Sequence, residues 1–234
     1  MTNKEFIEEL EKIGIKITEK MEIQLEKYYD ILIEKNKYMN LTGITEKKQV
    51  YLKHFYDSAT IYKIIDLNKI DTLCDIGTGA GFPGMVLKIL FPKLKVTLVD
   101  SLNKRVEFLK DVINKLELNN IEVFHERAEV FANNNREKFD VVTARAVAPL
   151  NVLVEYCIPM IKKNSFFIPM KANISQEMQE SENALKKLNC KIINSIEFLL
   201  PKENSIRTIL LIRKEKETSK IYPRKFSEIK KNPL

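Results

Sequence analysis

DIGTGAGFPG, at residues 75–84, follows a short β-rich run and precedes an apolar run with helical spacing. Glycine tolerates positive φ and lets a ligand approach bare backbone, and the first turn of a helix offers free amide groups to that ligand. A glycine-rich loop between a strand and a helix is typical of a site for a nucleotide-like cofactor. We therefore interpret residues 75–84 as a cofactor loop.

From residue 71 onward, β-rich runs alternate with helical stretches, which predicts a parallel sheet covered by helices on both faces. The last two runs are joined only by residues 201–205, too few for a helical crossover, so we expect them to form an antiparallel pair. Strands are predicted at 72–75, 96–99, 121–124, 141–144, 165–170, 191–200 and 206–213, and helices at 84–90, 103–116, 149–161 and 175–188.

The first 60 or so residues have helical patterns only. Thr18 is a predicted N-cap, after which Met21, Leu25, Tyr28 and Leu32 recur at helical spacing. A shorter helix is expected at residues 4–13, ending at Gly14, and another at 49–65. We predict an N-terminal helical cap at residues 1–66, a main domain at 67–215 and a basic C-terminal tail at 216–234.

The bulk composition is that of a folded, cytoplasmic protein. The 234 residues are 44% hydrophobic, which suffices for a sizeable core, and no apolar run approaches the ~20 residues that span a bilayer. The N-terminus lacks an apolar signal core. We expect no membrane association. Three separated cysteines and two histidines favour buried thiols and no metal site.

The net charge of +7 is concentrated near the C-terminus. Residues 213–234 contain eight basic and three acidic side chains, a net charge of +5. Such a segment suits a polyanion, because neutralising phosphates releases condensed counterions. A solvated segment that only aids solubility explains the charge equally well. Charge alone leaves both interpretations open.

The strand ends narrow the identity of the cofactor. Asp100 ends the second predicted strand, where an acidic side chain can accept hydrogen bonds from both ribose hydroxyls of an adenosine. Phe82 stands where a dinucleotide loop has its third glycine. Asp75 suits the ammonium of a methionine moiety and would repel a diphosphate. These residues favour S-adenosylmethionine over a nicotinamide cofactor, the cofactor of the alternative oxidoreductase reading.

The third and fourth strand ends supply the remaining candidates. Glu129, or the backbone at Ala128, can bond the adenine amino group. Arg145 follows the fourth strand, where charged side chains usually meet a ligand. With Asp75, Gly77, Gly79, Phe82 and Asp100, these three complete the predicted cofactor site.

The residues also limit the atom that is methylated. The fourth strand is not followed by the Asp/Asn-Pro-Pro-aromatic motif expected for exocyclic amines, and no cysteine is placed to attack a pyrimidine. A purine N7 carries an available lone pair and no proton, so transfer to it needs positioning and exclusion of water more than a base. N7 methylation is permitted by this pattern and not required by it.

Seven motifs together resemble one family, the bacterial 16S rRNA guanine-N7 methyltransferases, also called the glucose-inhibited division protein B (GidB) family. The resemblance covers nearly the whole chain. Its motifs are NLTGI at 40–44, His54 with Asp57-Ser58, the loop at 75–84, VDS at 99–101 with Lys104-Arg105, RAE at 127–129, TARAV at 143–147, and YPRK at 222–225 with KNP at 231–233.

The resemblance implies a class I methyltransferase fold, Rossmann-like, with a seven-stranded sheet and a terminal antiparallel hairpin. It implies transfer from S-adenosylmethionine to N7 of the guanosine at position 527 of 16S rRNA, leaving S-adenosylhomocysteine. It also implies cofactor contacts at Gly77, Phe82, Ala128, Glu129 and Arg145. Two departures are Gly43, where alanine is expected, and FSEI at 226–229, where small residues are usual.

The expected partner is 16S rRNA or the small ribosomal subunit, bound by a monomer. Removal of the tail after Lys220 is expected to weaken RNA binding and spare cofactor binding. A non-catalytic rRNA-binding or assembly factor on the same fold is the alternative. Candidate positioning residues are His54, Asp57 and Arg145; for His54 and Asp57 a purely structural tie between cap and domain is equally open, and for Arg145 the alternative is a surface ion pair. Candidate RNA contacts are Lys104, Arg105, Arg127, Arg145, Lys171, Arg224 and Lys225.

Overall fold

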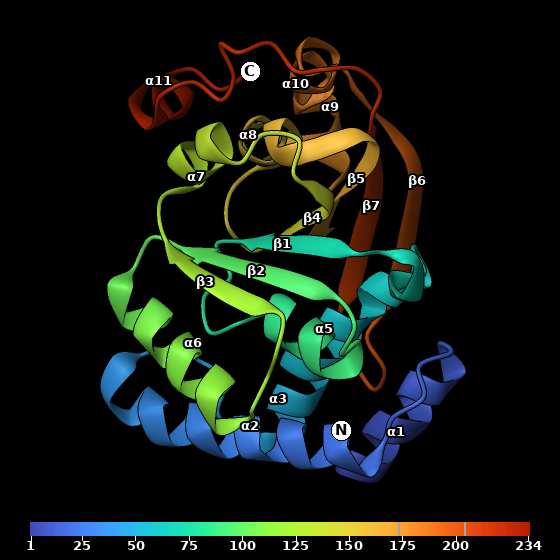
Figure 1. Ribbon diagram of the computed structural model, residues 1–234. Helices are drawn as coiled ribbons and strands as arrows, with labels where there is room; N and C mark the ends of the chain where they lie inside the picture. Colours follow the sequence, from blue (N-terminus) through green and yellow to red (C-terminus); the bar gives the residue numbers. More distant parts are fainter. Residues whose placement is uncertain (173, 204) are drawn as a thin grey trace.

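The computed structural model describes residues 1–172, 174–203 and 205–234, so Asn204 of the predicted 201–205 connection lies outside the described residues. A seven-stranded sheet runs through the molecule in the order β3-β2-β1-β4-β5-β7-β6 (Figure 1). The strands are β1 (Thr72–Ile76), β2 (Lys95–Asp100), β3 (Ile121–His125), β4 (Phe139–Arg145), β5 (Ile161–Lys171), β6 (Cys190–Leu199) and β7 (Ile206–Lys214).

The pairing confirms the predicted sheet. The first five strands run parallel to their neighbours, whereas β7 is antiparallel to both β5 and β6. The carboxyl ends of β1, β2 and β4 therefore meet at one edge, and the amino end of β7 lies at the same edge. Crevices outside the carboxyl ends of parallel strands are where ligands bind in open α/β sheets.

Helices cover both faces of the sheet (Figure 1). One face carries the N-terminal helices together with α5 (Gly84–Leu90) and α6 (Asn103–Lys115), and the other carries the C-terminal helices. The N-terminal helices are α1 (Asn3–Lys12) and α2 (Glu19–Met39); the far-face helices are α7 (Ala128–Asn134), α8 (Leu150–Cys157), α9 (Ser175–Glu180), α10 (Glu182–Lys187) and α11 (Phe226–Lys231).

The start of α2 confirms that Thr18 is its N-cap residue. The Thr18 hydroxyl accepts a hydrogen bond from the Met21 amide at 3.4 Å, as an N-cap does.

The predicted helix at 49–65 is helical but irregular. It consists of α3 (Lys47–Val50), a π-helix at Tyr51–Tyr56, α4 (Asp57–Ala59) and a 3₁₀ helix at Thr60–Lys63. Single π turns often occur at functional sites, and this one carries His54.

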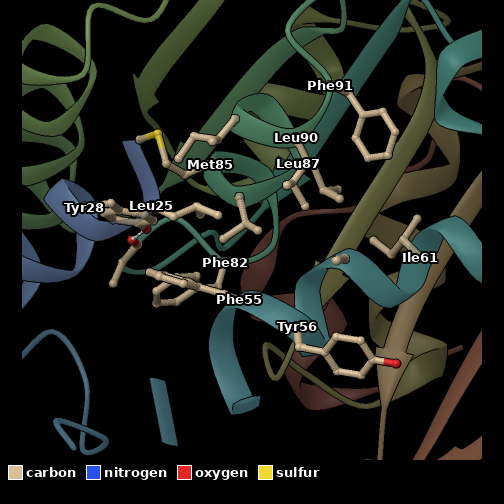
Figure 2. Packing of buried hydrophobic residues seen from close by; sticks show 14 of the residues in the cluster. Leu25, Tyr28, Phe55, Tyr56, Ile61, Phe82, Met85, Leu87, Leu90 and Phe91 are labelled. Atoms are coloured by element: carbon tan, nitrogen blue, oxygen red, sulfur yellow. Dashed lines mark hydrogen bonds between the residues drawn. The ribbon is translucent and has the colours of Figure 1, made fainter. Parts of the chain in front are cut away.

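The helix that follows the glycine loop is buried on all sides. Every residue of α5 is buried, including Lys88, whose ammonium donates to the carbonyls of Pro92 and Leu94. The cap covers the side of α5 that faces away from the sheet, with the Tyr28 ring 5.5 Å from Phe55 and 5.6 Å from Phe82 (Figure 2). The cap therefore packs directly on the loop that we predicted to hold the cofactor.

The far face differs from the prediction in three places. Helix α7 was not predicted, the predicted helix at 149–161 ends as a 3₁₀ turn at Ile158–Met160, and the one at 175–188 is broken at Ser181. Strand β5 starts at residue 161 rather than 165, and its first residues pair with β4 before an irregularity in the register of the two strands. The three cysteines are buried and unpaired, as expected.

The C-terminal residues are folded against the far face (Figure 1). Tyr222 and Ile229 belong to its hydrophobic cluster, and the Arg136 guanidinium donates to the carbonyls of Thr218 and Tyr222. Arg224 pairs with Glu155, a fully buried carboxylate on α8, at 2.6 Å. Residues 216–234 are thus a packed segment with one short helix, which charge alone did not indicate.

Candidate active site

Asp75 lies beneath the glycine loop and shapes it. Its Oδ2 accepts from the Thr78 hydroxyl at 2.7 Å and from the Gly84 amide at 2.8 Å. A Cβ on Gly84 would stand 2.9 Å from the Asp75 carboxylate, so this close approach requires glycine. The Oδ1 atom has no hydrogen-bond partner among the described residues.

Burial raises the pKa of Asp75 to about 7, against the bonds from Thr78 and Gly84, which lower it. The folded protein therefore holds this proton up to about pH 7, whereas an unfolded aspartate releases it near pH 4. The folded state binds more protons within that window. Stability contributed by Asp75 is present at low pH and is lost as the pH rises from about 4 to 7.

Asp75→Asn is expected to remove this loss, because the amide oxygen can still accept from Thr78 and Gly84 while carrying no charge. At pH 8 the variant should be more stable than the parent by roughly 1–3 kcal/mol, and the two should converge near pH 4. Urea unfolding at both pH values measures this, with Asp71→Asn, an exposed site, as the control. Parallel pH profiles for Asp75→Asn and the parent would rule out the shifted titration.

Gly77 and Asp100 lie at the carboxyl ends of the neighbouring strands β1 and β2. Gly77 adopts φ +67°, and a Cβ there would meet the Val147 side chain at 2.6 Å. Asp100 is 2% exposed and accepts from the amides of Gly79 and Leu102, each at 2.9 Å. Arg105 adds an ion pair at 3.3 Å. The carboxylate is thus held in place beside the loop, and its role as a ribose acceptor stays a prediction.

A pocket of about 600 Å³ opens at this edge of the sheet. That volume lies in the range of small-molecule sites. Four predicted cofactor residues line it, namely Gly77, Asp100, Ala128 and Glu129. Helix α7 begins at Ala128, which turns the Glu129 carboxylate toward the pocket, where Arg127 donates to it at 2.7 Å. A second hollow, of about 430 Å³, lies at the opposite, amino-terminal edge of β1 and β2 and holds no predicted site residue.

The other predicted cofactor residues lie outside the pocket lining, among the residues that the structure describes. Asp75 is turned into the loop, and Gly79 contributes its amide to Asp100. Phe82 packs against the cap, with the His54 ring stacked on it at 4.4 Å and 13°. Arg145 has its guanidinium 5.3 Å from the Phe82 ring centroid. Phe82 and Arg145 therefore belong to a second cluster between cap and sheet.

His54 is held in one tautomer within that cluster. Arg145 Nη2 donates to His54 Nδ1 at 3.3 Å, so the ring proton lies on Nε2, which donates to the Thr42 hydroxyl at 2.8 Å. Burial, together with the Arg145 charge, lowers the pKa of His54 to about 3. The imidazole is therefore neutral at physiological pH, and both ring nitrogens are occupied.

Asp57 joins two arginines at the same place. Its Oδ2 accepts from Arg145 Nη1 at 2.9 Å and its Oδ1 from Arg207 Nε at 3.0 Å. The structure thus brings the three predicted positioning residues together. Arg207, which the sequence analysis missed, joins them because antiparallel β7 begins at the carboxyl edge of the parallel strands. A basic residue opening a strand was the available signal.

The predicted RNA contacts divide by their partners. Lys171 and Arg224 are engaged inside the fold, with Glu177 at 2.7 Å and with Glu155. Arg105 is bound to Asp100, and Arg127 stacks on Phe226 at 3.8 Å. Lys104 and Lys225 are exposed, although Lys104 donates to the Met39 carbonyl.

Within residues 1–172, 174–203 and 205–234, no helix is both long and apolar enough to cross a bilayer. The histidine, cysteine and acidic side chains of these residues form no group of three or more that could hold a metal ion.

Comparison with known proteins places the chain in one methyltransferase family. A family model described as GidB, rRNA small subunit methyltransferase G, matches residues 21–206. The "Ribosomal RNA small subunit methyltransferase G" of Bacillus subtilis strain 168 is 47% identical over 237 residues, covering 100% of this chain and 99% of the relative.

Solved structures show the same fold at low identity. StiE O-MT, residues 961–1257, superposes with a TM-score of 0.57 at 13% identity, covering 80% of this chain and 83% of that one. P. horikoshii TYW2, solved with MeSAdo, gives 0.51 at 12% identity, covering 63% and 59%. With the strand order β3-β2-β1-β4-β5-β7-β6, these likenesses confirm the predicted class I methyltransferase fold.

Proposed function

The chain belongs to the GidB family, rRNA small subunit methyltransferase G, and is a methyltransferase of ribosomal RNA; we propose that it methylates N7 of a guanosine in 16S rRNA, at position 527. The methyl donor in this proposal is S-adenosylmethionine, and the product is S-adenosylhomocysteine. The observation that supports the donor is one pocket lined by the glycine loop, Asp100 and Glu129.

The side chains of this pocket fit that donor. The sulfonium of S-adenosylmethionine supplies an electrophilic methyl group when bound. Asp100 is proposed to accept the ribose hydroxyls, and Glu129 or the Ala128 backbone to bond the adenine amino group. Asp75, which lies outside the pocket lining, is proposed to support the donor by shaping the loop through its bonds to Thr78 and Gly84. Gly77 is proposed to lie close to the donor, and its lack of a Cβ makes room for Val147, which lines the same pocket.

The cluster between cap and sheet supports N7 as the target. A purine N7 needs no deprotonation, so an enzyme that methylates it works by orientation and exclusion of water. His54 is neutral with both nitrogens occupied, and Asp57 is committed to Arg145 and Arg207. Neither is free to act as a general base. We propose that Arg145, His54 and Asp57 position the guanosine side of the site.

Asp100→Ala is expected to weaken binding of S-adenosylhomocysteine by roughly 1–3 kcal/mol, because two ribose hydrogen bonds are lost. Calorimetric titration of the full chain measures this. Glu107→Ala, an exposed change on the adjacent α6, should bind like the parent. An unchanged affinity in Asp100→Ala, at an unchanged melting temperature, would remove Asp100 from the donor site.

Transfer of labelled methyl groups tests the function itself. Unmethylated 16S rRNA is offered as free RNA and as assembled small subunits, at equal concentration, with the parent and with Asp100→Ala. We expect the parent to label the RNA of at least one form and Asp100→Ala to label it much more slowly. A parent protein that binds the donor and labels neither form would contradict the proposal.

A further inference from the structure

The C-terminal helix α11 stands against the donor pocket. Phe226, Ile229 and Lys230 of this helix, and Pro233 after it, line the same cavity as Gly77, Asp100 and Glu129. The charge of this segment suggested a role toward RNA. The position of this segment suggests instead a role in binding the methyl donor.

The segment is anchored on both sides of α11. Before the helix, Arg224 donates through Nε and Nη2 to the buried Glu155 carboxylate, at 2.8 and 2.6 Å. Within it, Ile229 is fully buried in the far-face cluster. After it, the Asn151 side chain donates to the Leu234 carbonyl at 3.4 Å. These ties hold the helix over the pocket.

Arg127 contacts both Phe226 and Glu129 and so joins α11 to the start of α7. The guanidinium lies 3.8 Å over the Phe226 ring and donates from Nε to Glu129 Oε1 at 2.7 Å. Phe226 therefore stands beside Glu129, the residue proposed to bond the adenine. Phe226 is 39% exposed, so that beyond the face covered by Arg127 it keeps free surface that a flat base can contact.

We propose that Phe226, backed by the buried Ile229, forms the apolar wall against which the adenine of the methyl donor binds, so that the C-terminal segment completes the donor site. This rests on the proposed function, because it takes S-adenosylmethionine as the donor. Aromatic contact with a base is favourable for any π face, and Glu129 beside it selects the amino edge of adenine. The wall belongs to the stretch 226–229, where the sequence departs from the family resemblance.

The proposal reverses one expectation from the sequence. Removal of the segment after Lys220 was expected to spare donor binding, and it should instead open the pocket. Docking of the segment and binding of the donor must also affect each other equally. If the docked segment raises donor affinity, bound donor must stabilise the docked segment by the same factor.

Phe226→Ala tests the wall without removing a buried residue. Calorimetric titration of the full chain with S-adenosylhomocysteine should show a Kd about tenfold above that of the parent. Phe226→Tyr, which keeps the ring, should bind like the parent. Ile221→Ala is the matched control, since Ile221 is 67% exposed in the same segment and does not line the pocket.

A second probe locates the lost contact. Methylthioadenosine has the adenosine part and no amino acid, so its Kd should rise by the same factor in Phe226→Ala. Loss for S-adenosylhomocysteine alone would place the contact elsewhere and overturn the adenine assignment. Tryptic cleavage after Lys225, Lys230 and Lys231 in the parent should slow when S-adenosylhomocysteine is present.

The outcomes separate the two proposals. A parent that binds neither S-adenosylhomocysteine nor methylthioadenosine would refute the proposed donor. A parent that binds both, with Phe226→Ala binding equally well and cleavage rates unaffected by ligand, would refute the wall and leave the donor in place.

Discussion

Asp57→Ala is expected to lower the free energy of unfolding by roughly 3–5 kcal/mol, the usual result of removing one partner from a buried charge group. Asp57 is 5% exposed and its partners Arg145 and Arg207 are 15% and 19% exposed. Without the carboxylate, two guanidinium groups face each other with little water to screen them. The cap and the sheet would then repel at their contact.

Chemical denaturation of the parent and of Asp57→Ala measures this loss. Asp71→Ala is the control, because its ion pair with Lys95 is exposed and should contribute little to stability. Arg207→Ala in the Asp57→Ala background should recover part of the loss by removing one of the facing charges. A cost below 1 kcal/mol for Asp57→Ala would show that solvent already screens the pair of arginines.

Arg224→Ala is the second large effect, and we expect it to cost roughly 3–5 kcal/mol as well. Glu155 is fully buried and accepts three hydrogen bonds, from the Arg224 backbone amide, Nε and Nη2. The variant keeps only the backbone bond, so the carboxylate stays buried without its counter-charge. Arg224, a predicted RNA contact, thus has a structural partner that the sequence did not show.

Thermal and urea unfolding of Arg224→Ala give the cost, and Arg213→Ala gives the comparison, since its pair with Glu215 is largely exposed. Glu155→Gln combined with Arg224→Ala should be more stable than Arg224→Ala alone, because no charge remains buried. If the double variant is no better than the single one, loss of packing and not of charge accounts for the effect.

The parts of the fold and site that depend on local pattern were predictable. The strand and helix alternation, the loop at 75–84, the Thr18 cap and the acidic end of β2 at Asp100 each follow from neighbouring residues. Side-chain period and turn chemistry act over a few residues. A single sequence is sufficient for features of this range.

The missed features depend on contacts between distant residues. Arg224 and Glu155 are 69 residues apart, and Arg207 and Asp57 are 150 apart. Helix α7 is seven residues long, too short for a clear apolar period. The many basic residues of 216–234 drew attention away from Tyr222 and Ile229, two of the apolar residues that pack the segment on the far face.

The direction of a side chain was also beyond the sequence. Asp75 was placed correctly beside the loop, but its carboxylate faces the Thr78 hydroxyl and Gly84 amide rather than the pocket. Phe82, predicted as a cofactor contact, packs against His54 and the cap, and its contact with the donor stays a prediction. Contacts within the loop decide the direction of Asp75, whereas the packing of the cap on the loop decides that of Phe82, and that packing involves residues before position 60.

Identification of the methylated atom tests the central proposal most directly. 16S rRNA labelled by the parent protein is digested to nucleosides for chromatography, and a second portion is reduced with borohydride and cleaved with aniline, which cuts the strand at N7-methylguanosine. We expect the label to elute with 7-methylguanosine and the strand to break at one position, 527. Label on an exocyclic amine, a ribose or a pyrimidine, or no strand break, would contradict the account.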